Sequence, residues 1–242
     1  MARQRDPDFM NRLAQAGMEI FARDGLANAR MSEVAERLGV SQGTLYNYVE
    51  SKDALFCIAL DRATGAEHIP LPEELPVEGP TIESIRDGLE EAAPEAFRLE
   101  ALDAAVEREE CEDPARELRE IVGEFYDRLA KTRWAADVIE RSAQDIPELH
   151  DLFFLQIRRS VIERLTRYLT LRGESGCIRR LEDPGVTARL LTEVVDYAAR
   201  RRHRDPDPRA GDLEGYRDAV ADLVIRGLLL RPLPVPAEGG GA

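Results

Sequence analysis

The sequence has few of the residues from which metal, redox and disulfide sites are built. It holds three cysteines and three histidines in 242 residues. Cys57, Cys111 and Cys177 are widely spaced, and they show neither the paired spacing of a zinc site nor a disulfide framework. We therefore expect reduced structural thiols, no metal site and no cofactor.

Sequence motifs of enzymes are missing as well. There is no glycine-rich phosphate loop and no nucleophile motif. His68, His150 and His203 stand apart from one another, and no Glu-x-x-His pair occurs where a helical di-metal site would need one. All-helical hydrolases and metal oxidases remain the rival class, because the chain is rich in carboxylates, but we expect that it is not an enzyme.

Long apolar runs and lysine are also scarce. No segment approaches the roughly 18 apolar residues of a membrane helix, and residues 1–8 contain no apolar signal segment. We expect a cytoplasmic protein without membrane contact. Only Lys52 and Lys131 are lysines among 33 basic residues, a bias that suits a GC-rich bacterial genome.

The net charge of −14 is unfavourable for a nucleic-acid binder, but it is unevenly distributed. Residues 1–52 contain seven basic and seven acidic side chains, whereas the rest of the chain contains 26 basic and 40 acidic ones. The amino-terminal part is thus neutral. The acidic remainder keeps the body of the protein away from DNA and aids solubility.

Residues 31–53 have the pattern of two short helices, a tight turn and the start of a third helix. Apolar residues of the first helix recur on one face, and Gly39 follows where a helix end favours a positive φ. Ser41 is placed to cap the second helix. In that helix Leu45 and Val49 face inward, so small polar groups are left outside, as a DNA groove requires. This is a helix-turn-helix.

The same residues resemble the DNA-binding signature of the tetracycline-repressor (TetR) family. The resemblance is carried by LGVSQGTLYNY at residues 38–48 and SKDAL at residues 51–55, with Ala16, Ile20, Phe21 and Gly25 upstream. It covers about residues 9–62. It implies an all-α protein with a three-helix DNA-binding domain and a larger helical-bundle domain for ligand binding and dimerisation.

The resemblance also implies roles for individual residues in binding double-stranded DNA. Gln42 and Asn47 are expected to read bases, and Gly43 to let the helix backbone approach closely. The residues expected to hold phosphates are Thr44, Tyr46, Tyr48 and Lys52. Where the family usually has hydroxyl residues before the second helix, this chain has Ala29-Arg30, so Arg30 would supply a charged phosphate contact. Glu50 opposes phosphate attraction.

The domain boundaries follow from composition and periodicity. We expect the helix-turn-helix domain at 1–50, a connector helix at 51–68, a helical ligand-binding and dimerisation domain at 69–232, and a disordered tail at 233–242. Residues 69–80 contain four prolines and a glycine and cannot be helical throughout. Beyond them, helical spacing recurs with no strand alternation, and Asp113-Pro114 and Asp183-Pro184 each predict a helix start.

Two further surfaces are expected in the helical body. The resemblance implies a homodimer formed by the last two helices, with interface residues Leu190, Val194, Tyr216, Val220, Leu223, Val224 and Gly227. An aromatic-rich region with polar neighbours is typical of a small-molecule site, although aromatics at helical spacing are more often ordinary core. The candidate effector-binding residues are Phe97, Phe125, Tyr126, Arg133, Trp134, Glu140, His150 and Phe153.

The sequence therefore predicts a DNA-binding transcriptional regulator, with a ligand-responsive repressor on a pseudo-palindromic operator as the first choice. The effector is an unknown small molecule. A transcriptional activator of the same family remains an alternative. So does an all-helical interaction protein with a degenerate DNA-binding head, which a gel-shift assay on its own upstream region would separate.

Overall fold

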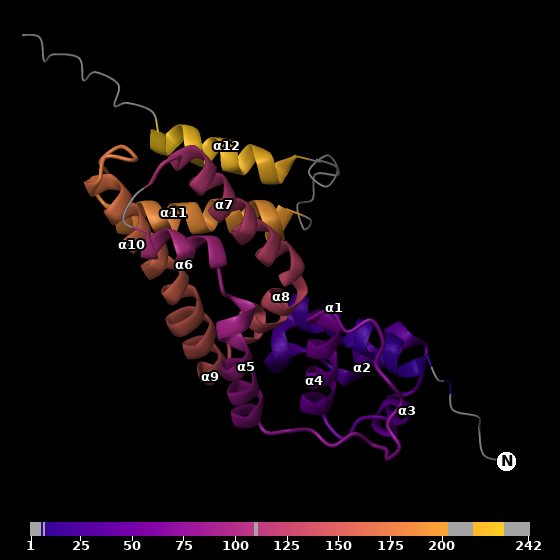
Figure 1. Cartoon of the computed structure of the whole chain (residues 1–242). Helices are drawn as coiled ribbons and strands as arrows, with labels where there is room; N and C mark the ends of the chain where they lie inside the picture. Colours follow the sequence, from indigo (N-terminus) through magenta and orange to yellow (C-terminus); the bar gives the residue numbers. More distant parts are fainter. Residues whose placement is uncertain (1–5, 7, 109–110, 203–214, 230–242) are drawn as a thin grey trace, which may run out of the picture. The chain divides into compact units, whose positions relative to one another are not determined.

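The computed structural model describes residues 6, 8–108, 111–202 and 215–229. Every regular element in these ranges is a helix, and their only paired extended backbone is an isolated parallel bridge between Val49 and Val77. The all-α prediction is confirmed. The chain (Figure 1) divides into two compact units, unit 1 with residues 1–98 and 128–160, and unit 2 with residues 99–127 and 161–242.

The expected domain boundaries at residues 50 and 68 stay predictions, and the expected tail at 233–242 lies outside the described residues. Among the helices that the structure describes, none has both the length and the apolar character needed to span a membrane. The three cysteines are free thiols.

Unit 1 begins with the four helices of the amino-terminal head. These are α1 (Phe9–Asn28), α2 (Met31–Leu38), α3 (Gln42–Tyr46) and α4 (Lys52–Ala63). Helices α1 and α4 pack against each other along their lengths, with Phe21 and Phe56 edge to face at 5.2 Å between ring centroids. Ser51 caps α4 by accepting a hydrogen bond from the Ala54 N–H, and the helix ends at Ala63, before the end of the expected connector at residue 68.

The remaining helices of unit 1 come from further along the chain. They are α5 (Ile82–Ala96), α8 (Arg133–Ser142), α9 (Pro147–His150) and the π-helical segment η1 (Asp151–Arg158). Both α1 and α4 pack on α8, and α5 packs on α9 and η1. The head therefore shares one apolar core with α8, which includes Val138 and Leu149.

The end of α1 is fastened to the end of α8. Gly25 breaks the helical geometry of α1 with φ 76°, and a Cβ there would lie 2.9 Å from the Arg141 carbonyl oxygen. One residue later, the Leu26 N–H donates to the Ser142 hydroxyl at 3.0 Å. The Arg141 guanidinium donates to the Arg23 carbonyl at 3.0 Å. Helix α1 thus breaks at Gly25 and continues for about one more turn, to Asn28.

Unit 2 contains α6 (Glu100–Glu107), α7 (Pro114–Lys131, which enters unit 1 at residue 128), most of α10 (Arg159–Glu174), α11 (Pro184–Asp196), η2 (Tyr197–Arg201) and α12 (Tyr216–Leu229). The two predicted Asp-Pro starts are confirmed, because Asp113 accepts from the Arg116 N–H and Asp183 from the Val186 N–H. Helix α12 is tied to α7 by an ion pair of Arg217 with Asp127.

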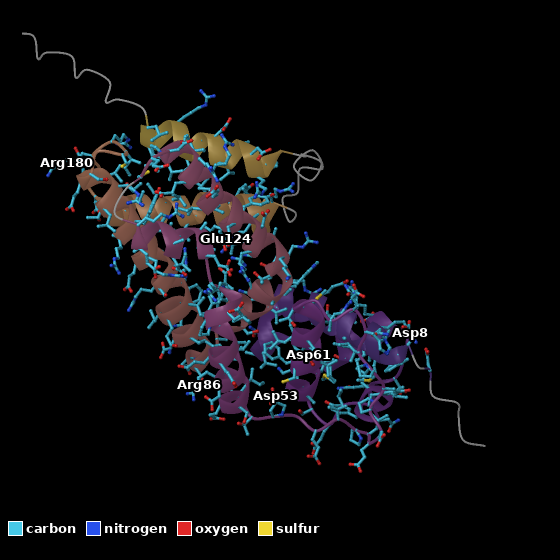
Figure 2. The ribbon with its side chains drawn as sticks, in the orientation of Figure 1. Asp8, Asp53, Asp61, Arg86, Glu124 and Arg180 are labelled. Carbon is cyan, nitrogen blue, oxygen red and sulfur yellow. The ribbon has the colours of Figure 1, made fainter. Side chains whose placement is uncertain are left out.

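Helix α6 begins without a cap of its own. Leu99 stands at the N-cap position and makes no side-chain hydrogen bond. Instead Glu124 of α7, labelled in Figure 2, accepts from the N–H groups of Glu100 and Ala101 at 2.8 Å each. A carboxylate at this position satisfies two N–H donors that have no partner within the helix, and its negative charge is stabilised by the positive end of the helix dipole.

A buried ion pair holds α10 against α7 and α6. Arg172 is 2% exposed and Glu117 is 8% exposed. The Arg172 guanidinium donates to both Glu117 oxygens, at 2.7 and 3.1 Å, and to the Ala105 carbonyl at 2.6 Å. Burial raises the pKa of the Glu117 carboxyl, but Arg172, together with Tyr168 and Cys111, more than offsets this and holds the pKa below its ordinary value.

Replacing Arg172 with methionine should therefore lower the free energy of unfolding by about 3–5 kcal/mol, since Glu117 would stay buried without its partner. Urea unfolding measures this, and Arg167→Met, an exposed arginine on the same helix, is the matched control. Because the folded pKa of Glu117 is lowered, its stabilisation is complete above about pH 4.3 and is lost as the pH falls through the folded pKa. Equal losses in the two variants would contradict a structural role for the pair.

Candidate nucleic-acid interface

The recognition helix α3 is positioned by two apolar residues that point into the head. Leu45 lies within α3 and Val49 follows it, and both are fully buried. They join the same core as Phe21 and Leu55. The inward direction predicted for Leu45 and Val49 is confirmed, so the opposite side of α3 is left free to face a ligand.

Both ends of the turn before α3 have the predicted geometry. Gly39 ends α2 with φ 68°, the left-handed conformation that glycine adopts without a steric penalty. Ser41 is the N-cap, and its hydroxyl accepts from the Thr44 N–H at 3.1 Å and pairs with the Thr44 hydroxyl at 2.8 Å. Arg30, at the N-cap of α2, makes no capping hydrogen bond.

The exposed side of α3 presents small polar groups. Gln42, Gly43 and Asn47 are exposed, and the Tyr46 ring is 43% exposed. A Cβ on Gly43 would meet only the Ser41 hydroxyl, at 3.9 Å. Packing within the chain therefore does not require glycine here. An approaching molecule could come close to this part of the backbone.

The other expected phosphate contacts are more constrained. The Tyr48 ring is half-buried and lies 4.2 Å from the Phe9 ring of α1, centroid to centroid. The Lys52 ammonium donates to the carbonyls of Ala27 and Ala29, at 2.9 and 3.2 Å. Arg30 is exposed. Lys52 thus binds the carbonyls at the end of α1, and no local sequence pattern predicts this contact.

Ion pairs cover much of the positive charge of the head. Arg23 contacts both Asp24 and Glu33, and Arg37 contacts Glu19. Hydrogen bonds from the Arg23 guanidinium hold the pKa of the Asp24 carboxyl below its ordinary value. The head is neutral locally as well as in total, so hydroxyl and amide groups make up most of the polar surface on α3.

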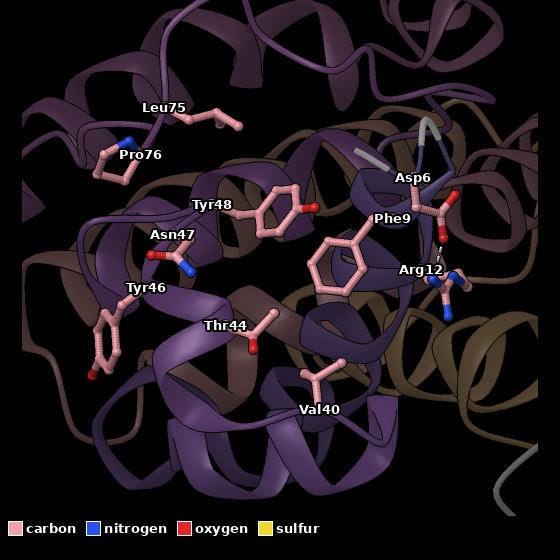
Figure 3. Close-up of a pocket in the computed structure, with 10 residues that line it drawn as sticks. All are labelled: Asp6, Phe9, Arg12, Val40, Thr44, Tyr46, Asn47, Tyr48, Leu75 and Pro76. Carbon is pink, nitrogen blue, oxygen red and sulfur yellow. Dashed lines mark hydrogen bonds and ion pairs between the residues drawn. The ribbon is translucent and has the colours of Figure 1, made fainter. Parts of the chain in front are cut away.

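Residues 69–80, which we call the strap, return to the head beside α3. The sequence predicted only a boundary or long loop here. The strap instead pairs with the turn after α3, since the Glu50 N–H donates to the Val77 carbonyl at 2.9 Å and the Val77 N–H to the Tyr48 carbonyl at 2.8 Å. Leu75 and Pro76 then face a groove that also has Tyr46 and Asn47 in its wall (Figure 3).

The candidate effector-binding residues fall in different units. Phe125 and Tyr126 belong to unit 2, and the other six belong to unit 1. In unit 1, Phe153 packs edge to face on Phe154 at 5.0 Å, and the His150 ring lies 5.1 Å from Phe154. Within the described ranges, no group of three or more His, Cys, Asp or Glu side chains is placed to hold a metal ion.

The candidate dimer residues differ in exposure. Leu190, Val194 and Leu223 are exposed, whereas Val220 is buried within its own subunit. Gly227 is exposed. The remaining two, Tyr216 and Val224, are half-buried. The exposed apolar stripe of α11 is longer than predicted, because it continues to Val186 and Tyr197.

Comparison with known proteins agrees with this geometry. Residues 13–57 match the bacterial regulatory proteins of the tetR family. A tetR-family regulatory protein from Rhodococcus RHA1 superposes with a TM-score of 0.52 at 18% identity, over 92% of this chain and 98% of that one. The regulator FadR from Bacillus halodurans has a TM-score of 0.49 at 17% identity, over 95% and 100%. No curated protein matches the chain.

The fold and the exposed face of α3 define the amino-terminal part as a helix-turn-helix DNA-binding domain. The match to the tetR family of bacterial regulatory proteins covers residues 13–57 of this domain, and the chain as a whole has the fold of the Rhodococcus regulatory protein.

Proposed function

We propose that the chain is a ligand-responsive repressor that binds a pseudo-palindromic operator as a homodimer. The observation that carries the proposal is the five-residue helix α3, which is anchored by buried Leu45 and leaves Gln42, Tyr46 and Asn47 exposed. Side chains of this size reach base edges and phosphates in a major groove. Gln42 and Asn47 read bases, and Thr44, Tyr46, Tyr48, Lys52 and Arg30 hold phosphates. A transcriptional activator would use the same surface.

Replacing Tyr46 with alanine should weaken binding to DNA from upstream of the chain's own gene by about tenfold or more, since a hydrogen bond to a charged phosphate is lost. The loss should be similar for every sequence that the wild type binds. Asn47→Ala should instead change the base preference at particular positions, by about 1–3 kcal/mol. Fluorescence anisotropy on a set of duplexes separates the two patterns. Unchanged binding of Tyr46→Ala would show that α3 is not the reading helix.

The proposed dimer interface is the exposed apolar face of α11 and α12. Val186, Leu190, Val194 and Tyr197 recur every three or four residues, so they form one stripe on α11 and η2. Leu223 on α12 is 62% exposed. Large apolar side chains gathered on one face of a subunit mark an association surface. Dimerisation would supply the second head that a two-fold operator requires.

Leu223→Arg should convert the dimer into a monomer without unfolding the subunit. Because Leu223 is exposed in the single chain, arginine there costs little until a second subunit buries it without a partner. Light scattering gives the mass, and helical circular dichroism checks the fold. Leu171→Arg, the same change at an exposed leucine on α10, should leave the mass unchanged. A wild-type protein that is monomeric at micromolar concentration would refute the interface.

The proposed effector acts through α8. Helix α8 carries Trp134 and Glu140, packs on α1 and α4, and ends at Ser142, which is bonded to the Leu26 N–H of α1. A ligand that moves α8 therefore moves the head. The acidic body favours a neutral or cationic lipophile. A hundredfold preference for the form that does not bind DNA would supply about 2.7 kcal/mol of coupling.

A screening compound that releases DNA should also change the fluorescence of Trp134, the only tryptophan. In Ser142→Ala the hydrogen bond to Leu26 is lost, so the compound should still change the fluorescence but release DNA less well. Ser160→Ala, at an exposed serine on α10, serves as the control. A compound that releases DNA equally from both variants would contradict transmission through the end of α8.

A further inference from the structure

The groove beside α3 has a volume of about 590 Å³ and two unlike walls (Figure 3). One wall is built from the head itself, from residues that include Thr44, Tyr46, Asn47 and Tyr48. The other wall is Leu75 and Pro76 of the strap. The groove is therefore continuous with the surface that we propose for DNA, and the strap forms its outer side.

The strap is held in this place at three points. At its start the Ile69 N–H donates to the Asn11 side-chain oxygen at 2.7 Å, and Ile69 is buried. Near its end, both the N–H and the carbonyl of Val77 are hydrogen-bonded to the turn after α3. Gly79 then lies so close to the start of α4 that a Cβ would be 2.8 Å from the Ala54 nitrogen. Residues 70–76 therefore bridge two fixed points and form a built wall.

The chemistry of the groove fits a sugar-phosphate backbone. Three hydroxyl groups and the Asn47 amide can donate to phosphate oxygens, which accept hydrogen bonds only. The Arg12 guanidinium also lines the groove, where it pairs with Asp6 at 2.5 Å. Phe9, Val40 and the strap supply apolar surface that suits the sugars. A phosphate could replace Asp6 at Arg12 and complete this set of contacts.

The negative charge of the strap repels the phosphates of such a backbone. Glu73, Glu74 and Glu78 are exposed, and the strap contains no lysine or arginine. We propose that the strap is the outer wall of a groove that receives one sugar-phosphate backbone of duplex DNA, and that Glu73 and Glu74 limit the affinity there. This inference rests on the proposed DNA-binding function. The acidic strap would weaken binding to non-specific DNA, and helix α3, which has no acidic residue, cannot do this.

The charge variant Glu73→Gln/Glu74→Gln tests this on full-length protein with mixed-sequence duplex DNA, because the electrostatic contribution to binding does not depend on sequence. Its affinity should rise about fivefold at about 0.01 M salt, where charges interact over about 30 Å, and the gain should shrink towards about 0.15 M, where they interact over about 8 Å. Glu73→Lys/Glu74→Lys should bind more tightly still.

The matched control is Glu90→Gln/Glu91→Gln. Both residues are exposed on α5, which packs on α9 and η1, and the variant has the same net charge as the first. It should show little gain. An equal gain in the two variants would overturn the inference, since it would then reflect net charge alone.

A steric variant gives an independent reading. Leu75→Trp should fill the groove and lower DNA affinity about tenfold, while thermal unfolding confirms that the half-buried position accepts the larger ring. Unchanged affinity would show that no DNA enters the groove. If wild-type protein binds DNA and the strap variants match their controls, only this inference fails. If no form of the protein binds any duplex, the proposed function fails with it.

Discussion

The burial of Leu45 and Val49 is the constraint on which the proposed DNA-binding surface depends. A helix of five residues cannot persist in water by its own hydrogen bonds, because nucleation costs more than so few bonds return. Helix α3 is held instead by apolar contacts beneath it, by the Ser41 cap before it and by the pairing of Tyr48 and Glu50 with Val77 after it. Its exposed face is consequently free to carry polar groups that add nothing to stability.

The proposed response of the head to the rest of unit 1 depends on contacts between the end of α1 and the end of α8. Gly25 admits the Arg141 carbonyl, and Ser142 satisfies the buried Leu26 N–H that the break in α1 leaves open. Leaving the buried Leu26 N–H without its acceptor would cost about 1–3 kcal/mol. A movement of α8 that keeps this hydrogen bond therefore moves α1 as well. The coupling therefore follows from a required hydrogen bond and close packing within one unit.

Much of the fold could be predicted because its signals are local. The Asp113 and Asp183 caps, the turn at Gly39 and the inward face of α3 each depend on residues within one or two turns. The exposure of the polar residues on α3 could be predicted for the same reason. Their roles in DNA binding rest on the resemblance of residues 38–55 to one family and stay predictions.

The rest depends on partners far along the chain. No local pattern shows that Glu124 caps α6 or that Lys52 binds the carbonyls of Ala27 and Ala29. The strap is the clearest case, since its prolines exclude a helix but do not indicate that Val77 pairs with Tyr48 and Glu50. The candidate effector-binding residues likewise lie in two different units. Helical spacing shows which face of a helix is apolar, but it does not show which other helix packs on that face.

In the proposed complex, two copies of α3 enter successive major grooves of one duplex. Hydroxyl-radical footprinting of the wild-type protein on DNA from upstream of its gene tests this directly. Two protected patches related by a two-fold axis, with centres about 34–36 Å apart or somewhat more, are the predicted result. A single patch, or no protection at protein concentrations that saturate binding, would contradict the account.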